Sequence, residues 1–162
     1  MNKAIRNLGL IALLLFTCTE CDKESSAVNP QGLLDSVPAN QYYSSEILNT
    51  KNLALYGTWK PVKTSGGIGG TGYKIDFDYL IIKPYGVFGL VRADSLATYG
   101  SIAIFKQTDT EFSIDFVSDT DPEKVGIQMV TDTEKYIQIH NDTLELVAFC
   151  CDRFNTQLVK VK

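Results

Sequence analysis

The chain has 162 residues, and 44% of them are hydrophobic, which suffices for the core of one domain. It carries 15 basic and 19 acidic residues, a formal net charge of −4. Nucleic-acid binding is not expected, because a chain with this balance lacks the basic surface that displaces counterions from a phosphate backbone.

The N-terminus has the pattern of a secretory signal peptide. Lys3 and Arg6 precede an apolar run from Leu8 to Phe16, interrupted only by Gly9. The run is too short to span a bilayer and matches the hydrophobic region of a signal. A buried N-terminal helix is the alternative, but the run has no polar face. We therefore predict export.

The end of this run, Leu15-Phe16-Thr17-Cys18, resembles a bacterial lipobox, in which the cysteine is acylated and becomes the N-terminus. The resemblance implies a lipoprotein signal peptide over residues 1–17 and lipid attachment at Cys18, hence an anchor in the cell envelope, at the outer membrane. Cys21 is the alternative site, although Glu20 suits cleavage poorly; secretion with a thiol at Cys18 is another. Cleavage would leave 145 residues (162 − 17) with 13 basic and 19 acidic residues, a net charge of −6.

Residues 18–48 are predicted to be a tether, because they are rich in Ser, Asn, Pro and acidic residues and show no sustained period. A flexible coil of roughly 27 residues, from residue 19 to about residue 45, would span about 25–30 Å. Its acidic cluster, Glu20, Asp22 and Glu24, resembles the export signal of surface lipoproteins in Bacteroidota. A solvated tether has the same composition, so the periplasmic and surface-exposed placements both stay open.

Residues 49–162 are predicted to form one β-domain. A helical turn is expected between Asn49 and Gly57, after which β-branched and aromatic residues come in short runs separated by turn signals. This spacing indicates an antiparallel sandwich or barrel. About nine strands are expected: Trp59–Thr64, Tyr73–Lys83, Val87–Arg92, Tyr99–Gln107, Glu111–Val117, Val125–Val130, Lys135–His140, Thr143–Phe149 and Asn155–Val161.

The glycine-rich stretch after the first strand matches the spacing of a dinucleotide-binding loop, from Gly67 to Gly72. That loop works because a helix follows it and its N-terminal N–H groups hold a pyrophosphate. Residues 73–78 alternate like a strand instead, and no Gly-Lys-Ser/Thr motif is present. We predict a connection between strands without a nucleotide.

Three stretches carry a family resemblance: GTWKPVKTSGGIGG, DYLIIKPYGVFGLVR and DTLELVAFCCDRFNTQLVKV. Together they resemble the lipocalin-like, calycin-type lipoproteins of Bacteroidota over about residues 53–162. The resemblance implies an up-and-down barrel of about eight strands, with Trp59 plugging the closed end and the glycine-rich loop as a lid over the open end. Arg153 is a candidate to stack on Trp59.

An eight-stranded barrel is either filled by its own side chains or holds one small ligand. The resemblance favours a binding protein for a small apolar or amphipathic molecule. The alternative is a protein-interaction or inhibitor module that uses the rim loops, with a partner that the sequence does not identify. The candidate ligand-binding residues are Trp59, Phe77, Tyr79, Phe88, Leu90, Ile104, Phe112 and Ile114.

No catalytic, metal or cofactor site is predicted. His140 lies at a tight turn, and no motif pairs it with a nucleophile and an orienting acid, so a hydrolase ranks behind the two binding functions. Asp76 and Asp78 are expected on one solvated strand face. The acidic residues from Asp119 to Glu123 have the spacing of a calcium loop, but the required glycine and final glutamate are replaced by Lys124 and Val130.

The cysteines outside the lipobox leave several options. Cys150 and Cys151 are neighbours and would point to opposite faces of a strand as ordinary thiols. A strained vicinal disulfide, or a link from Cys21 to one of them, is the alternative in an oxidising compartment. Reduced or structural roles are favoured over a redox site.

Overall fold

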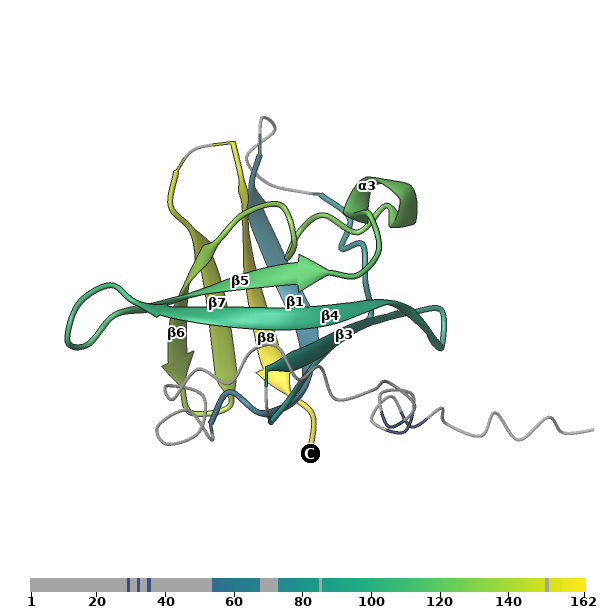
Figure 1. Ribbon diagram of the computed structural model, residues 1–162, viewed down its shortest axis with the longest axis horizontal. Helices are drawn as coiled ribbons and strands as arrows, with labels where there is room; N and C mark the ends of the chain where they lie inside the picture. The colour runs from purple at the N-terminus through teal and green to yellow at the C-terminus, as the bar shows by residue number, and fades with distance from the viewer. Residues whose placement is uncertain are drawn as a thin grey trace, which may run out of the picture.

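The structure, a computed structural model, describes Asn29, Gly32, Asp35 and residues 54–67, 73–84, 86–150 and 152–162. Eight antiparallel strands follow one another around a closed barrel, and the last pairs with the first (Figure 1). The predicted all-β, up-and-down barrel is confirmed. The strands are β1 (Gly57–Gly66), β2 (Tyr79–Lys83), β3 (Val87–Arg92), β4 (Ser95–Lys106), β5 (Phe112–Ser118), β6 (Lys135–His140), β7 (Thr143–Ala148) and β8 (Phe154–Lys160), with a short helix α3 (Pro122–Val125) before β6.

Apolar side chains that point inward alternate with polar side chains that point outward along the strands, and the inward ones form the core. Trp59 on β1 is buried while its neighbour Lys60 is exposed, and Leu80 and Ile82 on β2 point into the same interior. The interior is one continuous apolar cluster, since its members contact one another across the barrel. Its buried members are Leu55, Trp59, Phe77, Leu80, Ile82, Phe88, Leu90, Ile102, Ile104, Ile114, Phe116, Ile127, Met129, Val130, Leu144, Leu146 and Leu158.

Tight turns set the register of the hairpins. Gly86 has a φ of 74° in the connection from β2 to β3, a backbone conformation that glycine adopts without strain. The connections from β3 to β4 and from β6 to β7 are two-residue turns, Ala93-Asp94 and Asn141-Asp142, and Ala93, Asp94 and Asn141 all have positive φ. These turns match the right-handed twist of the flanking strands.

One end of the barrel, which we call the mouth, carries the connections whose described residues are 67, 73–78, 93–94, 119–134, 149–150 and 152–153. The C-terminus lies at the opposite end (Figure 1). The predicted strand over Val125–Val130 is wrong. Asp121 instead starts the helical turn of α3: its carbonyl accepts hydrogen bonds from Lys124 and Val125, and its side chain accepts one from Glu123.

Two seams of the barrel are short. β1 pairs with β2 only from Gly57 to Trp59, and β5 pairs with β6 only from Phe112 to Ile114. The predicted strand from Tyr73 begins only at Tyr79, because residues 73–78 leave the ladder of β1. Beyond its short seam, β1 carries Pro61 and a bulge between residues 61 and 63, two features that blunt an exposed strand edge.

The predicted signal peptide over residues 1–17 lies outside the described residues, as do Cys18 and Cys21. Of the predicted tether, the structure describes three positions. The N–H of Gly32 donates to the carbonyl of Asn29 at 3.0 Å, and Asp35 forms an ion pair with Lys83 at the end of β2. The predicted helical turn before Gly57 is described only at Ala54, Leu55 and Tyr56, where Ala54 and Leu55 form a turn.

Candidate functional site

The eight predicted ligand-binding residues divide into two groups. Six of them are buried members of the interior cluster, and the partly buried Phe112 packs against it. These seven residues are therefore part of the packed barrel core. Tyr79 alone packs elsewhere, with Ile81 and Val91, in a smaller cluster separate from the interior. The six core residues are Trp59, Phe77, Phe88, Leu90, Ile104 and Ile114.

The closed end of the barrel is built around Trp59. Its indole Nε1 donates a hydrogen bond to the carbonyl of Leu55 at 2.8 Å, which holds the preceding turn across the barrel end. Lys160 of β8 lies over the ring, with its Nζ 5.1 Å from the ring centroid and 3.0 Å from the carbonyl oxygen of Ala54. The cation on Trp59 is therefore Lys160, whereas the predicted candidate Arg153 is exposed at the mouth.

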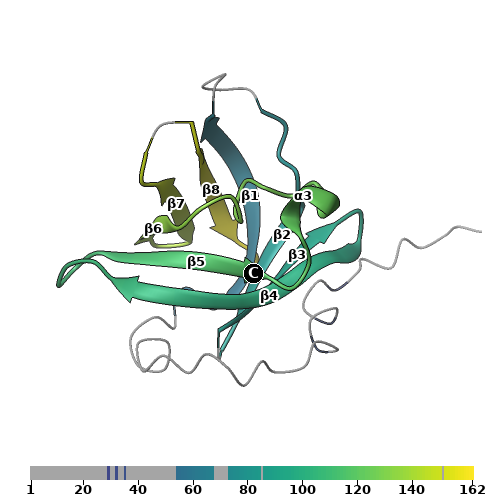
Figure 2. The same ribbon diagram turned by 45° about the horizontal axis from the view of Figure 1, so that its top comes forward.

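The connection between α3 and β6 fills the opposite end. Ile127, Met129 and Val130 belong to no strand, yet all three are buried in the interior cluster. Figure 2 shows this connection crossing the end of the barrel on its way to β6. These three side chains form what we call the plug, and they occupy interior space that a ligand would need.

Two polar side chains clamp the plug to the neighbouring connections. The Asp76 Oδ2 accepts hydrogen bonds from the N–H groups of Gln128 at 2.8 Å and Met129 at 3.2 Å. Arg92, at the end of β3, donates to the carbonyl of Val125 at 2.7 Å and to that of Gly126 at 3.2 Å. The expectation that Asp76 lies on a solvated strand face is wrong.

Burial changes the acid strength of Asp76. Desolvation raises the pKa of its carboxyl group above the ordinary aspartate value, and the hydrogen bonds from Gln128 and Met129 counteract part of this rise. Its other oxygen, Oδ1, is buried and has no hydrogen-bond partner. Asp76 thus holds the plug at an electrostatic cost.

A buried ion pair follows the plug along the chain. Lys135, at the start of β6, has a fully buried side chain that forms an ion pair with Asp132 and donates to the carbonyl of Phe154 at 2.7 Å. Asp132 in turn accepts from the N–H of Phe154 at 3.4 Å. Desolvation lowers the pKa of Lys135, and Asp132 opposes that shift. The pair ties the end of the plug to β6 and β8.

Two open clefts lie at the mouth, on either side of residues 75–78. One, of about 470 Å³, lies between β1 and this segment; the other, of about 520 Å³, lies between the segment and the end of β3. They share Ile75, Phe77, Asp78 and Ala93. Both clefts are open to solvent. The remaining lining residues are Lys60, Pro61, Tyr79 and Asp94 in the first cleft and Lys74, Asp76 and Arg92 in the second.

The wall shared by the clefts is held by Asp78. Its Oδ2 accepts a hydrogen bond from the N–H of Ala93 at 2.7 Å, and its own N–H donates to the carbonyl of Val91 at 2.7 Å. Ala93 has a φ of 50°, which costs free energy for a residue with a Cβ. Asp78 therefore fixes the position of the Ala93-Asp94 turn.

The arrangement defines a closed, plugged β-barrel with small clefts at its mouth. Comparison with known proteins finds no matching family model, no similar curated protein and no similar solved structure. Among the described residues, no helix is long and apolar enough to cross a membrane. The same part of the chain brings together no group of His, Cys, Asp and Glu residues that could hold a metal ion.

Sequence reasoning missed the residues that organise the mouth. Asp76, Arg92 and Lys135 look like ordinary polar residues in or beside strands, but each bonds to a backbone group far along the chain. His140 is exposed at the end of β6. Cys150 is exposed after β7, and Cys151 lies outside the described residues.

Proposed function

We propose that this chain is a lipid-anchored protein of the cell envelope, lipocalin-like in architecture, that binds a small amphipathic molecule at the mouth of its barrel. The observation that carries the ligand site is the pair of clefts flanking residues 75–78. The anchor rests on the lipobox resemblance at Cys18. The ligand site is placed at the mouth because the plug and the core side chains fill the barrel interior.

The chemistry of the clefts supports an amphipathic ligand. Ile75 is partly buried, contributes apolar surface to both clefts and packs against the barrel core, to which the buried Phe77 belongs. Charged groups of both signs line each cleft: Lys60 and Asp94 in the first, and Lys74, Asp76 and Arg92 in the second. A ligand with an apolar body and a polar head would bury its body against Ile75 and leave its head at the charged rim of the clefts.

Native mass spectrometry of the mature protein, isolated from its host membrane, tests the ligand. We expect a bound mass in the native protein that is lost in Ile75→Glu, which places a charge between both clefts. Val62→Glu is the matched control, because Val62 is 49% exposed and lines neither cleft. An empty native protein, or equal loss from both variants, would contradict the ligand site.

Labelling with an alkynyl fatty acid tests the anchor separately. Cys18→Ala should abolish incorporation of the label and release the protein from the membrane, whereas Cys21→Ala should keep both. The reverse result would assign the anchor to Cys21, and no label in the native chain would refute lipidation.

A protein-interaction module is the second candidate function, and the filled interior favours it. Among the described rim residues, Tyr73 and Phe149 expose aromatic surface at the mouth. Such residues are enriched where proteins bind one another. If the native protein carries no small molecule but copurifies in a fixed ratio with one envelope protein, this function replaces the first.

A further inference from the structure

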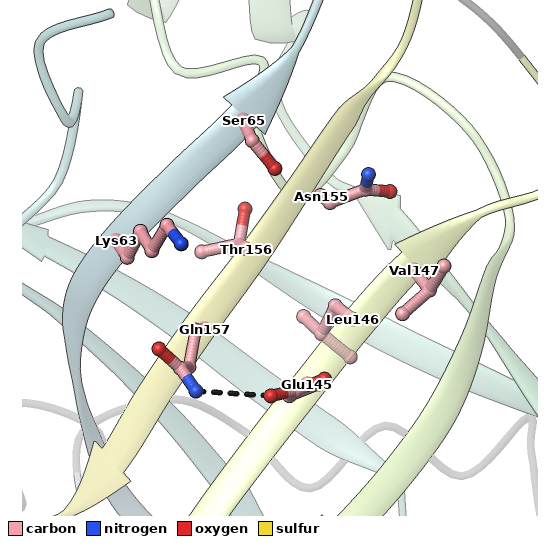
Figure 3. Close-up of a pocket in the computed structure, with 8 residues that line it drawn as sticks. All are labelled: Lys63, Ser65, Glu145, Leu146, Val147, Asn155, Thr156 and Gln157. Carbon is pink, nitrogen blue, oxygen red and sulfur yellow. Dashed lines mark hydrogen bonds between the residues drawn. The ribbon is translucent and has the colours of Figure 1, made fainter. Parts of the chain in front are cut away.

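The outer wall of the barrel carries a groove away from the mouth clefts. It has a volume of about 230 Å³ and lies over β1, β8 and β7 (Figure 3). Register pairs place Lys63 beside Gln157 and Gln157 beside Glu145, and Ser65 lies beside Asn155. Outward-facing polar side chains from three neighbouring strands therefore form two short rows. The lining residues are Lys63, Ser65, Glu145, Leu146, Val147, Asn155, Thr156 and Gln157.

Contacts within the protein fix the orientation of the polar groups in the groove. Gln157 donates through Nε2 to Glu145 Oε1 at 2.9 Å, which directs the amide oxygen of Gln157 away from that bond. Asn155 accepts the N–H of Ala148 on Oδ1 at 2.8 Å, so its NH₂ group is oriented as a donor. The groove thus presents fixed donors and acceptors side by side before any ligand arrives.

The groove has no net formal charge, because Lys63 and Glu145 carry opposite charges and its other lining residues are uncharged. An ionic ligand would meet a like charge as well as an opposite one. A hydroxyl group both donates and accepts a hydrogen bond, so closely spaced hydroxyls match alternating donors and acceptors. The chemistry favours a neutral, polyhydroxylated ligand.

An aromatic pair borders the groove on the side where β7 meets β6. The rings of Tyr136 and Phe149 lie 3.9 Å apart, centroid to centroid, and Tyr136 is the register partner of Val147, which lines the groove. Phe149 is 43% exposed. The exposed ring of Phe149, two residues after Val147, can cover the apolar face of a sugar ring at this edge of the groove while amides in the groove bond hydroxyls of the chain.

We infer that the outer wall formed by β1, β8 and β7 binds a neutral oligosaccharide chain, with Gln157, Glu145 and Asn155 bonding its hydroxyls and Phe149 packing on a sugar ring. This site is distinct from the mouth clefts, since the two share no lining residue. It does not depend on the function proposed for the mouth.

An array of neutral and uronic-acid-containing oligosaccharides, probed with the fluorescently labelled full-length mature chain, tests the inference. We expect binding to neutral chains and at least tenfold weaker binding of both Gln157→Ala and Phe149→Ala, the loss that follows when about 1.4 kcal/mol of contacts disappears. Phe105→Ala is the matched control for Phe149→Ala. Phe105 is 45% exposed and lies on β4, outside the groove, so its removal should leave binding unchanged.

Several results would overturn the inference. They are the absence of binding to every neutral oligosaccharide, stronger binding to acidic than to neutral chains, or equal weakening by Phe105→Ala and Phe149→Ala. Loss of glycan binding in Ile75→Glu, with Gln157→Ala unaffected, would assign the glycan to the mouth and refute the wall site. Melting temperatures of the variants, expected within about 2 °C of the parent, separate lost binding from lost folding.

Discussion

Replacing Asp76 with alanine should release the plug from the mouth. The substitution removes the acceptor of two backbone N–H groups. Gln128 is exposed and can bond to water instead, but Met129 is buried and its N–H would be left unsatisfied. Hydrogen bonds to a charged group contribute about 1.5–3 kcal/mol each, and an unsatisfied buried group costs about 1–3 kcal/mol. Removing the desolvated carboxylate recovers part of this, so we expect a net loss of about 2–3 kcal/mol.

Urea denaturation at pH 7 measures this loss in the free energy of unfolding, and hydrogen exchange locates it. Exchange should accelerate at the amides of Gln128 and Met129 more than in β3 or β7. Asp115→Ala is the control, because Asp115 lies on the outer face of β5 and should change stability by less than about 0.5 kcal/mol. Equal stabilities for the two variants, or unchanged exchange at Met129, would refute the role of Asp76.

Three further predictions concern the protonation of Asp76, the ion pair between Lys135 and Asp132, and the backbone of Gly57. Asp76→Asn should change how stability depends on pH. Because the pKa of Asp76 is raised in the folded protein, the free energy of unfolding of the native protein should fall as the pH rises from about 4 through that pKa. Urea titrations across this range should show the fall in the native protein and no such fall in Asp76→Asn. Lys135→Met should lower the free energy of unfolding, measured by urea denaturation, by about 3–5 kcal/mol, because it leaves the carboxylate of Asp132 buried without its cation. Adding Asp132→Leu should restore much of this loss. A loss below about 1 kcal/mol would contradict a buried ion pair. Gly57→Ala should cost about 1–3 kcal/mol by the same assay, because Gly57 has a φ of 135° and an added Cβ would lie 2.9 Å from Lys160 Cε; a neutral effect would show that the closed end can rearrange.

The sequence predicted the strands best where local turns delimit them. β3 has the predicted bounds because Gly86 ends the preceding turn and a two-residue turn follows Arg92. The hairpin of β6 and β7 follows from Asn141-Asp142 and alternating apolar residues. In these places the backbone requirement and the hydrophobic pattern agree, so short-range information is sufficient.

The prediction failed where distant partners decide the local structure. The apolar residues from Val125 to Val130 fit a strand, but Gly126 and the clamp by Asp76 and Arg92 make them a plug. A short apolar run predicts that its side chains are buried, but it does not predict whether its backbone pairs with a strand. The same limit explains why Asp76 was expected in solvent.

The candidate site was only partly predictable. Alternation correctly indicated that Phe88, Leu90 and Ile104 face the interior, but it cannot measure whether that interior has room for a ligand. Tyr79 is a predicted ligand-binding residue, but its place on β2 puts it one residue out of phase with Leu80, so it faces away from the interior. The clefts depend on where residues 73–78 leave the ladder, which side-chain types do not reveal.

The pairing of β1 with β8 makes folding of the barrel depend on its last strand. The barrel is sealed by its first and last strands, so ring closure must wait until the C-terminal strand has emerged and found a partner early in the chain. Contacts so far apart in sequence slow folding, typically to milliseconds or seconds. A chain that lost its last dozen residues would expose β1 and β7 as two open edges, and self-association would compete with folding.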